Sequence, residues 1–257
     1  MAYIEVKDVS KAYDRDGEAF QALSHVMLAV ERGEFICLLG PSGCGKSTLL
    51  GMLAGFEQPT SGSILIDGAP VAGPAASRVT IFQHYGLLPW QTVERNVMLG
   101  LLAKKVPKAQ ARKTAAHYIE LVGLSGYEQV RPGQLSGGMQ QRVAIARALA
   151  VKPEVLFMDE PFAALDAITR LKMQDDVHRI AEEEGVTVVF VTHDIEEAVS
   201  LADRIVVLSA NPGRVKEVVP VELGPDRLRT GEDFIAVRDH VFDVFGMKPD
   251  WDVEFVI

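Results

Sequence analysis

Residues 40–47 have the sequence G-P-S-G-C-G-K-S, whose glycines, lysine and serine could bind the phosphates of a nucleotide. Backbone N–H groups of residues 43–47 would surround the β-phosphate at a helix N-terminus, where the helix dipole favours anions. Lys46 would reach the β- and γ-phosphates, and the Ser47 hydroxyl would bind Mg²⁺. Thr48 would lie toward the α-phosphate. The candidate nucleotide-binding residues of this segment are Gly40, Pro41, Ser42, Gly43, Cys44, Gly45, Lys46, Ser47 and Thr48.

An acidic pair, Asp159 and Glu160, follows the apolar run V-L-F-M at residues 155–158. A buried strand there would place the Asp159 carboxylate beside the phosphate loop, where it could hold Mg²⁺ through water. Glu160 could polarise an attacking water as a general base. Taken alone, the pair could also be a surface feature at the end of a strand. The phosphate loop upstream favours the catalytic interpretation.

A second glycine-rich segment, L-S-G-G-M-Q at residues 135–140, opens a predicted helix. Ser136 can cap that helix, and Gly137 and Gly138 let its N-terminus approach a ligand closely. An ordinary helix start is the simpler interpretation. It does not explain why the segment occurs in a chain that already has a phosphate loop.

Length, charge and cysteine content narrow the class of protein. The 257 residues suit one domain with a smaller subdomain. A formal net charge of −9 argues against a nucleic-acid groove and against electrostatic docking on an anionic bilayer. The two cysteines suit a reducing compartment and are too few for a disulfide framework. The chain lacks a signal-peptide pattern, and its apolar runs are shorter than the roughly 18 residues that span a bilayer. We therefore expect a cytosolic chain.

Alternating strands and helices predict an α/β fold with a mainly parallel, doubly wound sheet. Helical periodicity over 93–150 predicts a helical subdomain inserted into this core. The predicted strands are 3–9, 18–30, 35–39, 64–66, 79–82, 155–158, 187–192 and 205–209. The predicted helices are 46–54, 109–122, 138–149, 167–184, 195–201 and 232–245.

The motifs and their order resemble those of the ATP-binding cassette (ABC) ATPases over nearly the whole chain. The order is the phosphate loop, Gln83 after a strand, L-S-G-G-M-Q, V-L-F-M-D-E at 155–160, A-L-D at 164–166 and His193 after V-V-F-V-T. The resemblance implies a P-loop NTPase fold of the ABC cassette type, with a mainly parallel sheet core, an antiparallel β subdomain and an inserted helical subdomain at about 84–150. It also implies a single cassette over 1–230 and a C-terminal helical extension over 231–257.

The resemblance also implies residue roles, with ATP and Mg²⁺ as ligands. Tyr13 would stack on adenine, and His193 would contact the γ-phosphate as a catalytic residue beside Glu160. Gln83 would act in catalysis and would join the Mg²⁺ ion, held by Ser47 and Asp159, to the helical subdomain. Without the family match, Tyr13 could equally pack at a strand end, and a histidine after a strand is more often structural.

In this family two cassettes pair head to tail, so that the L-S-G-G segment of one completes the ATP site of the other. Here the residues contributed to the partner's site would be Ser136, Gly137, Gly138 and Gln140. Asp166 would communicate between the two sites. The resemblance therefore implies a second cassette, in a homodimer, as a partner.

The stretches G-L-L-P-W-Q-T-V at 86–93 and N-P-G-R-V at 211–215 resemble the ATPases of nitrate, sulfonate and taurine importers. They imply an ATP-hydrolysing subunit of an importer for a small anion, of nitrate, sulfonate, taurine or bicarbonate type. The implied partners are integral membrane permease subunits, contacted through residues 83–100, and indirectly a periplasmic or extracellular solute-binding protein, but no nucleic acid. The chain would be peripheral to the cytoplasmic face of the inner membrane. Trp90 could instead be a core residue.

Three alternatives stay open. Soluble ABC ATPases act in nucleic-acid repair, chromosome maintenance or translation, but the spacing between Lys46 and Ser136 is too short for their long coiled-coil insertion, and no zinc pattern is present. A catalytically dead cassette conflicts with the intact set of catalytic residues. An exporter ATPase is disfavoured only by the importer-like stretches. Cys44, inside the phosphate loop, further predicts that alkylation would inhibit ATP hydrolysis.

Overall fold

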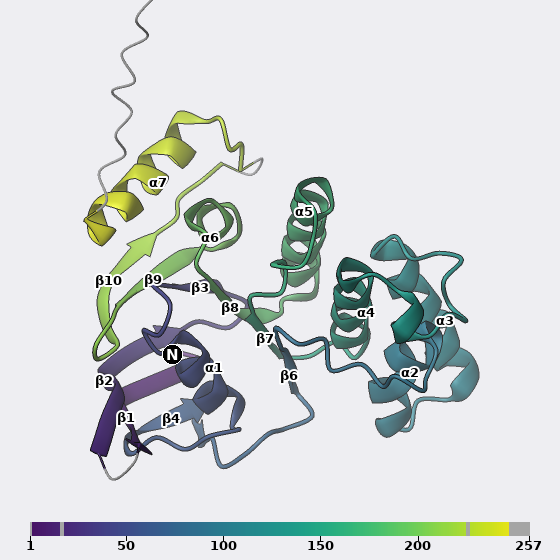
Figure 1. The fold of residues 1–257 in the computed structure, drawn as a ribbon, viewed down its shortest axis with the longest axis horizontal. Coiled ribbons are helices and arrows are strands. Elements are labelled where there is room, and N and C mark those ends of the chain that lie inside the picture. The colour runs from purple at the N-terminus through teal and green to yellow at the C-terminus, as the bar shows by residue number, and fades with distance from the viewer. Residues whose placement is uncertain (1, 16–17, 225–226, 247–257) are drawn as a thin grey trace, which may run out of the picture.

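Two β-sheets form the framework of the computed structural model, which describes residues 2–15, 18–224 and 227–246 (Figure 1). The larger sheet has the order β10-β9-β3-β8-β7-β6. Its strands are β3 (Phe35–Leu39), β6 (Arg78–Ile81), β7 (Val155–Asp159), β8 (Thr187–Thr192), β9 (Arg204–Ser209) and β10 (Arg214–Pro220). All neighbouring strands in it are parallel except β10, which is antiparallel to β9.

The smaller sheet is antiparallel throughout and has the order β2-β1-β4-β5. Its strands are β1 (Ile4–Arg15), β2 (Glu18–Val30), β4 (Ser61–Ile66) and β5 (Ala69–Pro70). A mainly parallel core with an antiparallel β subdomain and additional helices confirms the predicted fold class.

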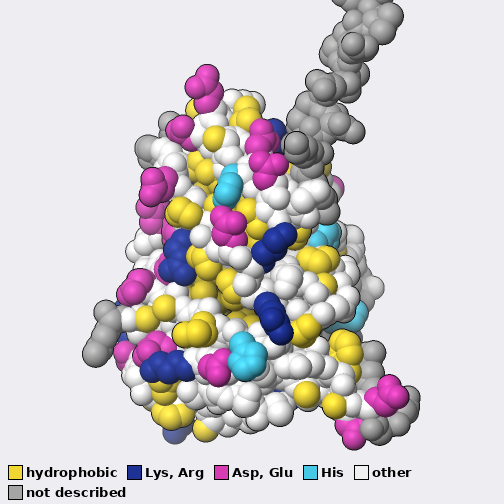
Figure 2. Space-filling view, turned by 90° about the vertical axis from the view of Figure 1, so that its left-hand side faces the viewer, with side chains coloured by type: hydrophobic (Ala, Val, Ile, Leu, Met, Phe, Trp, Pro, Cys, Tyr) yellow, Lys and Arg dark blue, Asp and Glu magenta, His cyan; other side chains and the backbone are white. Residues whose placement is uncertain are grey.

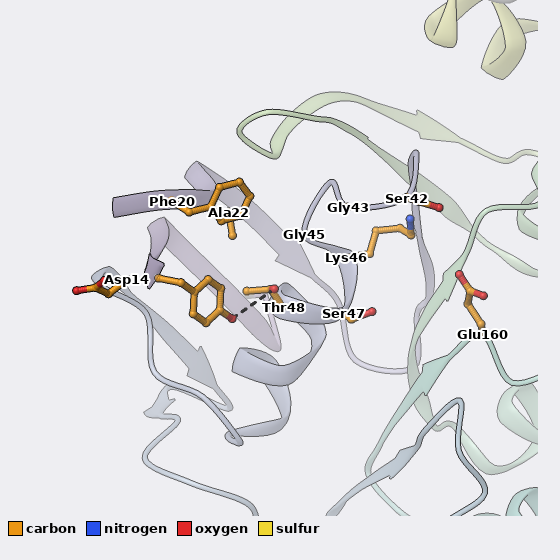
Figure 3. A pocket seen from close by; sticks show the side chains of 11 residues that line it. Asp14, Phe20, Ala22, Ser42, Gly43, Gly45, Lys46, Ser47, Thr48 and Glu160 are labelled. Atoms are coloured by element: carbon orange, nitrogen blue, oxygen red, sulfur yellow. Dashed lines mark hydrogen bonds between the residues drawn. The ribbon is translucent and has the colours of Figure 1, made fainter. Parts of the chain in front are cut away.

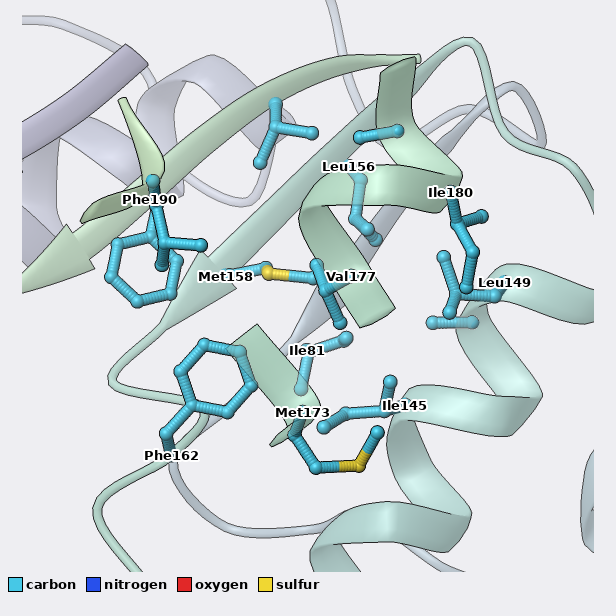
Figure 4. Packing of buried hydrophobic residues seen from close by; sticks show 14 of the residues in the cluster. Ile81, Ile145, Leu149, Leu156, Met158, Phe162, Met173, Val177, Ile180 and Phe190 are labelled. Atoms are coloured by element: carbon cyan, nitrogen blue, oxygen red, sulfur yellow. The ribbon is translucent and has the colours of Figure 1, made fainter. Parts of the chain in front are cut away.

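The central strands of the larger sheet are buried on both faces, which explains their continuous apolar sequences. Alternate side chains enter two separate cores. The core beside α5 (Ala167–Glu184) and α6 (Ile195–Leu201) receives Cys37, Leu39, Leu156, Met158, Val188 and Phe190 (Figure 4). The core beside α1 (Lys46–Ala54) and the antiparallel sheet receives Ile36, Leu38, Val155, Phe157, Val189 and Val191.

A group of helices lies to one side of the sheet, next to its β6 edge (Figure 1). It contains α2 (Val93–Ala103), α3 (Lys108–Leu121), the 3₁₀ turn η1 (Pro132–Gln134) and α4 (Gly137–Ala150). The Arg147 guanidinium of α4 donates to the carbonyls of Gly86 and Tyr85 at 2.7 and 3.0 Å, which ties the segment after β6 to this group. A second link joins this group to α5, because the Tyr118 hydroxyl of α3 donates to Glu184, the last residue of α5, at 3.1 Å.

The last helix, α7 (Glu232–Phe245), packs on α6 and β10. The predicted extension continues to residue 257, and its part after 246 lies outside the described residues. The predicted limits of the cassette, the helical subdomain and the extension stay predictions. Within the described residues, no helix is both long enough and apolar enough to cross a membrane.

Most predicted elements occur, with differences at irregular strands. β1 continues to Arg15, well past the predicted end at residue 9, because breaks in its register with β2 interrupt the apolar alternation that the prediction relied on. β10 was not predicted, because it is an edge strand with mostly exposed side chains. The two-residue strand β5 is too short to leave a sequence pattern.

Candidate functional site

The phosphate-loop segment connects the end of β3 to the start of α1 and wraps around the N-terminus of that helix. Gly45 caps α1 in the left-handed conformation, with φ of 94°. A Cβ on Gly45 would lie 2.6 Å from Leu23 of β2, so no other residue fits this position without displacing its neighbours. The first N–H groups of a helix have no partner within the helix. The loop therefore holds donors where an anion can bind.

Lys46 is buried beneath the loop, and its ammonium group donates to the carbonyls of Gly40 and Pro41 at 2.6 and 3.0 Å. These two bonds hold the positive charge of the ammonium group against the first two residues of the loop. Cys44, two residues earlier, is fully buried and packs in the core beside α1. Burial raises the pKa of its thiol, although the Lys46 ammonium acts in the opposite direction.

Ser47 and Asp159 provide two neighbouring oxygen ligands. The Ser47 hydroxyl donates to Asp159 Oδ1 at 3.1 Å, which joins the start of α1 to the end of β7. Burial raises the pKa of Asp159, and the Ser47 hydroxyl opposes that rise. A hydroxyl and a carboxylate suit Mg²⁺. Among the described residues no group of three or more His, Cys, Asp or Glu could hold a metal. An ion here would need phosphate oxygens and water to complete its coordination.

Glu160 and His193 meet at the same edge of the sheet. They follow β7 and β8, which are adjacent and parallel, and Asp159 pairs with Val191. Glu160 Oε1 lies 3.2 Å from His193 Nδ1. Glu160 has φ of 46°, a left-handed conformation that is strained for a residue with a side chain.

Gln83 lies two residues beyond β6, the strand that pairs with β7. It is exposed, and its position puts it at the edge of the sheet where Asp159 and Glu160 emerge. In the described part of the chain it makes no hydrogen bond to either carboxylate. Its assigned catalytic and metal-binding roles therefore rest on its position and on the family resemblance.

The pocket above the phosphate loop has a volume of about 590 Å³. Glu160 lies at one end, and Phe20 and Ala22 of β2 lie at the other, with the loop between them (Figure 3). Tyr13 of β1 also lines the pocket and pairs across the strands with Phe20. The Tyr13 hydroxyl donates to Glu57 at 2.5 Å, and burial is the main reason that its pKa is raised. Thr48 Oγ1 lies 3.5 Å from the same hydroxyl.

Three residues of this pocket were not identified from the sequence: Asp14, Phe20 and Ala22. An aromatic residue opposite Tyr13 in a predicted hairpin could have indicated Phe20. That inference would have required the register of β1 and β2, and β1 has irregular register. The structure therefore adds an apolar wall at the end of the pocket farthest from Glu160.

The L-S-G-G segment borders a separate hollow of about 310 Å³. The Ser136 hydroxyl caps α4 by accepting from the Met139 amide at 3.3 Å, as predicted. Gly138 lies against the Ala164 carbonyl, which a Cβ would approach to 3.3 Å. Asp166, at the other side of the hollow, caps α5. Backbone hydrogen bonds, above all from Thr169, lower the pKa of its carboxylate.

Gln140 faces back into its own segment, because its amide donates to the Leu135 carbonyl at 3.2 Å. It is absent from the residues that line either hollow. No described residue lines both hollows. The phosphate loop and the L-S-G-G segment therefore border two separate hollows of the described chain.

Comparison with known proteins places these features in one family. The family model described as "ABC transporter" matches residues 23–163. An uncharacterised ABC transporter ATP-binding protein of Methanocaldococcus jannaschii is 48% identical over 94% of this chain and 90% of its own length. The nitrate import ATP-binding protein NrtD of Synechococcus elongatus is 46% identical over 91% of this chain and 88% of its own length.

Further similarity extends to a bicarbonate transporter and to solved structures. The bicarbonate transport ATP-binding protein CmpD of Synechocystis sp. is 43% identical over 94% of this chain and 88% of its own length. A solved dimeric ATP-binding cassette, in a post-hydrolysis state with ADP and Pi, has a TM-score of 0.79 and 35% identity. That comparison covers 86% of this chain and 100% of the solved chain.

The burial of Cys44 does not support the expected sensitivity to alkylation, and it leads to a testable prediction. Because burial raises the pKa of the thiol, little reactive thiolate should form at pH 8. We expect iodoacetamide to leave Cys44 unmodified in the native protein, with ATP hydrolysis retained, as measured by peptide mass spectrometry and phosphate release. Both cysteines should react after unfolding in guanidinium. Stoichiometric modification of native Cys44 with loss of activity would contradict the prediction.

Proposed function

Because the chain belongs to the ABC transporter family, we propose that it is the ATP-hydrolysing subunit that drives a separate membrane permease. The observation that carries the proposal is the presence of a phosphate-loop half-site and an L-S-G-G half-site on separate surfaces of one chain. A protein built in this way needs a second cassette to complete each ATP site. We therefore propose a head-to-tail homodimer, and the similar solved cassettes are dimeric.

Within each proposed site, one set of residues would bind the nucleotide and Mg²⁺, and another set would promote hydrolysis. The loop amides and Lys46 bind the phosphates, and the aromatic wall of Tyr13 and Phe20 receives the adenine at the far end of the pocket. Ser47 and Asp159 would hold Mg²⁺, which when bound neutralises charge on the phosphates. Gln83, at the same edge of the sheet, would join the metal and water to the helical subdomain.

Hydrolysis needs a base for water and a group that responds to the γ-phosphate. Glu160 is suited to take a proton from water, because its carboxylate faces the pocket beside the loop (Figure 3). His193 lies within hydrogen-bond distance of that carboxylate, so it can orient Glu160. The family resemblance implies that His193 would also contact the terminal phosphate. Ser136, Gly137 and Gly138 of the partner would then cover the phosphates from the opposite side. Gln140 would support the shape of that segment.

The transported solute is proposed to be a small anion of nitrate, sulfonate, taurine or bicarbonate type. The named nitrate and bicarbonate relatives support this class at 43–46% identity. In such an importer the chain would lie at the cytoplasmic face of the inner membrane, peripheral through its permease, and a solute-binding protein outside would deliver the anion. On the face in Figure 2, acidic and basic side chains are interspersed, whereas a nucleic-acid groove needs clustered Lys and Arg. This pattern favours transport over a role in nucleic-acid repair.

The segment between β6 and α2 is the proposed docking surface for the permease. Asn96 of α2 is fully buried, and its side chain is hydrogen-bonded to the backbone of this segment. Its Oδ1 accepts from the Leu88 amide at 2.8 Å, and its Nδ2 donates to the carbonyls of Leu88 and Thr92 at 3.2 and 3.0 Å. Trp90 is nevertheless 65% exposed, which argues against the alternative that it is a core residue. A rigid loop that exposes a tryptophan suits a protein interface.

Replacing Glu160 tests the assigned base. We expect Glu160→Gln to keep ATP binding and to lower kcat by roughly 10²–10⁴-fold, because the amide cannot accept the proton from water. Fluorescent ATP-analogue binding and phosphate release would measure the two effects. Glu183→Gln, an exposed change on α5, is the matched control and should behave as wild type. Near-normal turnover in Glu160→Gln would remove Glu160 from this role.

Mixing two inactive variants tests the head-to-tail arrangement. Lys46→Ala disables the phosphate loop, and Ser136→Glu places a repelling carboxylate where the partner's phosphate would lie. Each homodimer should be inactive, whereas a mixed dimer has one site with both halves intact. Random mixing should restore roughly a quarter of the wild-type sites. If the two halves acted within one chain, mixing would restore no phosphate release above that of the separate variants.

A tryptophan substitution separates docking from hydrolysis. We expect Trp90→Ala to leave the ATPase rate of the isolated subunit unchanged but to weaken its binding to the co-purifying permease by about tenfold or more. Pull-down titration and transport into proteoliposomes would measure the loss. Tyr127→Ala, an exposed aromatic outside residues 83–100, is the control. Equal binding by both variants would contradict the proposed surface.

A further inference from the structure

The buried carboxylate of Glu197 contacts the residue that precedes His193 in the chain. Glu197, in the first turn of α6, is only 7% exposed. It does not line the nucleotide pocket or the second hollow. Burial raises the pKa of this carboxylate, so keeping it in the interior costs free energy unless its oxygens are well bonded. The hydrogen bonds it makes therefore indicate what it stabilises.

Glu197 bonds the last residue of β8, which is next to His193 in the chain. The Thr192 hydroxyl donates to Glu197 Oε2 at 2.6 Å and accepts from the Asp194 amide at 3.1 Å. The Glu197 amide in turn donates to Asp194 Oδ1 at 3.1 Å. These three bonds join Thr192, Asp194 and Glu197, so the residues before and after His193 are both fixed in the turn from β8 to α6. The histidine itself is exposed and projects from this fixed turn toward Glu160.

The other carboxylate oxygen is bonded to α5. Gln174 Nε2 donates to Glu197 Oε1 at 2.7 Å, and Gln174 Oε1 accepts from Arg229 at 2.5 Å. Gln174 is only 2% exposed, and the Arg229 bond fixes which end of its amide faces Glu197. Both oxygens of Glu197 therefore have donors in a defined orientation, and the α6 turn is attached to α5 as well as to β8.

We propose that Glu197 is a positioning residue that fixes the β8–α6 turn and so holds His193 at the catalytic Glu160 carboxylate. This inference rests on the proposed role of His193 and goes beyond it, because Glu197 contacts neither nucleotide nor reacting atoms. Loss of the two acceptor oxygens would free the Thr192 hydroxyl and the Gln174 amide, and the turn would lose its fixed shape. A displacement of about 1 Å at a catalytic group can lower a rate by about 100-fold.

The test compares substitutions at Glu197 and Thr192 in the full chain, at protein concentrations where the wild type forms dimers with Mg²⁺ and ATP. Glu197→Leu keeps the volume but removes both acceptors, and Thr192→Val removes the hydroxyl. We expect each to lower kcat by about 10- to 100-fold with KM for ATP little changed. Thr192→Ser keeps the hydroxyl and should retain most of the wild-type rate. Glu197→Gln keeps one acceptor oxygen of the two, so its rate should lie between those of the wild type and Glu197→Leu. Glu196→Gln, on the exposed side of the same helix turn, should match the wild type.

A double substitution separates positioning from general stability. If Glu197 acts through His193, Glu197→Leu should lower kcat no further in the His193→Ala background, as single-turnover hydrolysis would measure. An additional loss in the double variant, or wild-type kcat in Glu197→Leu, would overturn the inference. The role of His193 is tested separately. Wild-type kcat in His193→Ala would overturn that role first, whereas a slow His193→Ala beside a normal Glu197→Leu would overturn only the positioning role.

Discussion

Parallel pairing of β8 with both β3 and β7 brings the carboxyl ends of three buried strands to one edge of the sheet. A slip of one residue in any of them would send every side chain to the opposite core. The two cores have different shapes and neighbours, so the packing fixes the register. The phosphate loop follows β3, Asp159 ends β7, and His193 follows β8. Their closeness is thus a consequence of strand packing rather than of contacts among these residues themselves.

The charges at this edge of the sheet would favour a divalent cation as a companion to a bound polyphosphate. Asp159 and Glu160 bring two carboxylates beside a single ammonium, that of Lys46. Burial is the main reason that the pKa of Asp159 is raised, and repulsion from the Glu160 carboxylate adds to the rise. A polyphosphate adds further negative charge, which the loop amides and Lys46 offset only in part. In the proposed site, Mg²⁺ held by Ser47 and Asp159 would supply the remaining positive charge.

Sequence alone predicted the elements whose patterns are set by burial, and it missed features set by tertiary register. The helix after the phosphate loop and the strand 187–192 have the predicted bounds, because their apolar patterns and glycine breaks are local signals. Phe20 was missed because its place beside Tyr13 depends on how an irregular hairpin pairs. The inaccessibility of Cys44 and the burial of Glu197 likewise depend on which segments pack above them. No local pattern marks either property.

The helix α5 physically connects the two half-sites of one chain. Asp166, which borders the L-S-G-G hollow, caps its N-terminus, and two turns later Gln174 donates to the Glu197 carboxylate behind the His193 turn. In the proposed dimer, a partner's nucleotide that pressed on Asp166 would act on a helix that is also bonded to the turn carrying His193. Because Gln174 and Glu197 are buried and hydrogen-bonded to each other, a shift of α5 cannot be absorbed by rearranged solvent contacts. In the proposed dimer, the same packing that buries Glu197 would supply a mechanical route from one ATP site to the other.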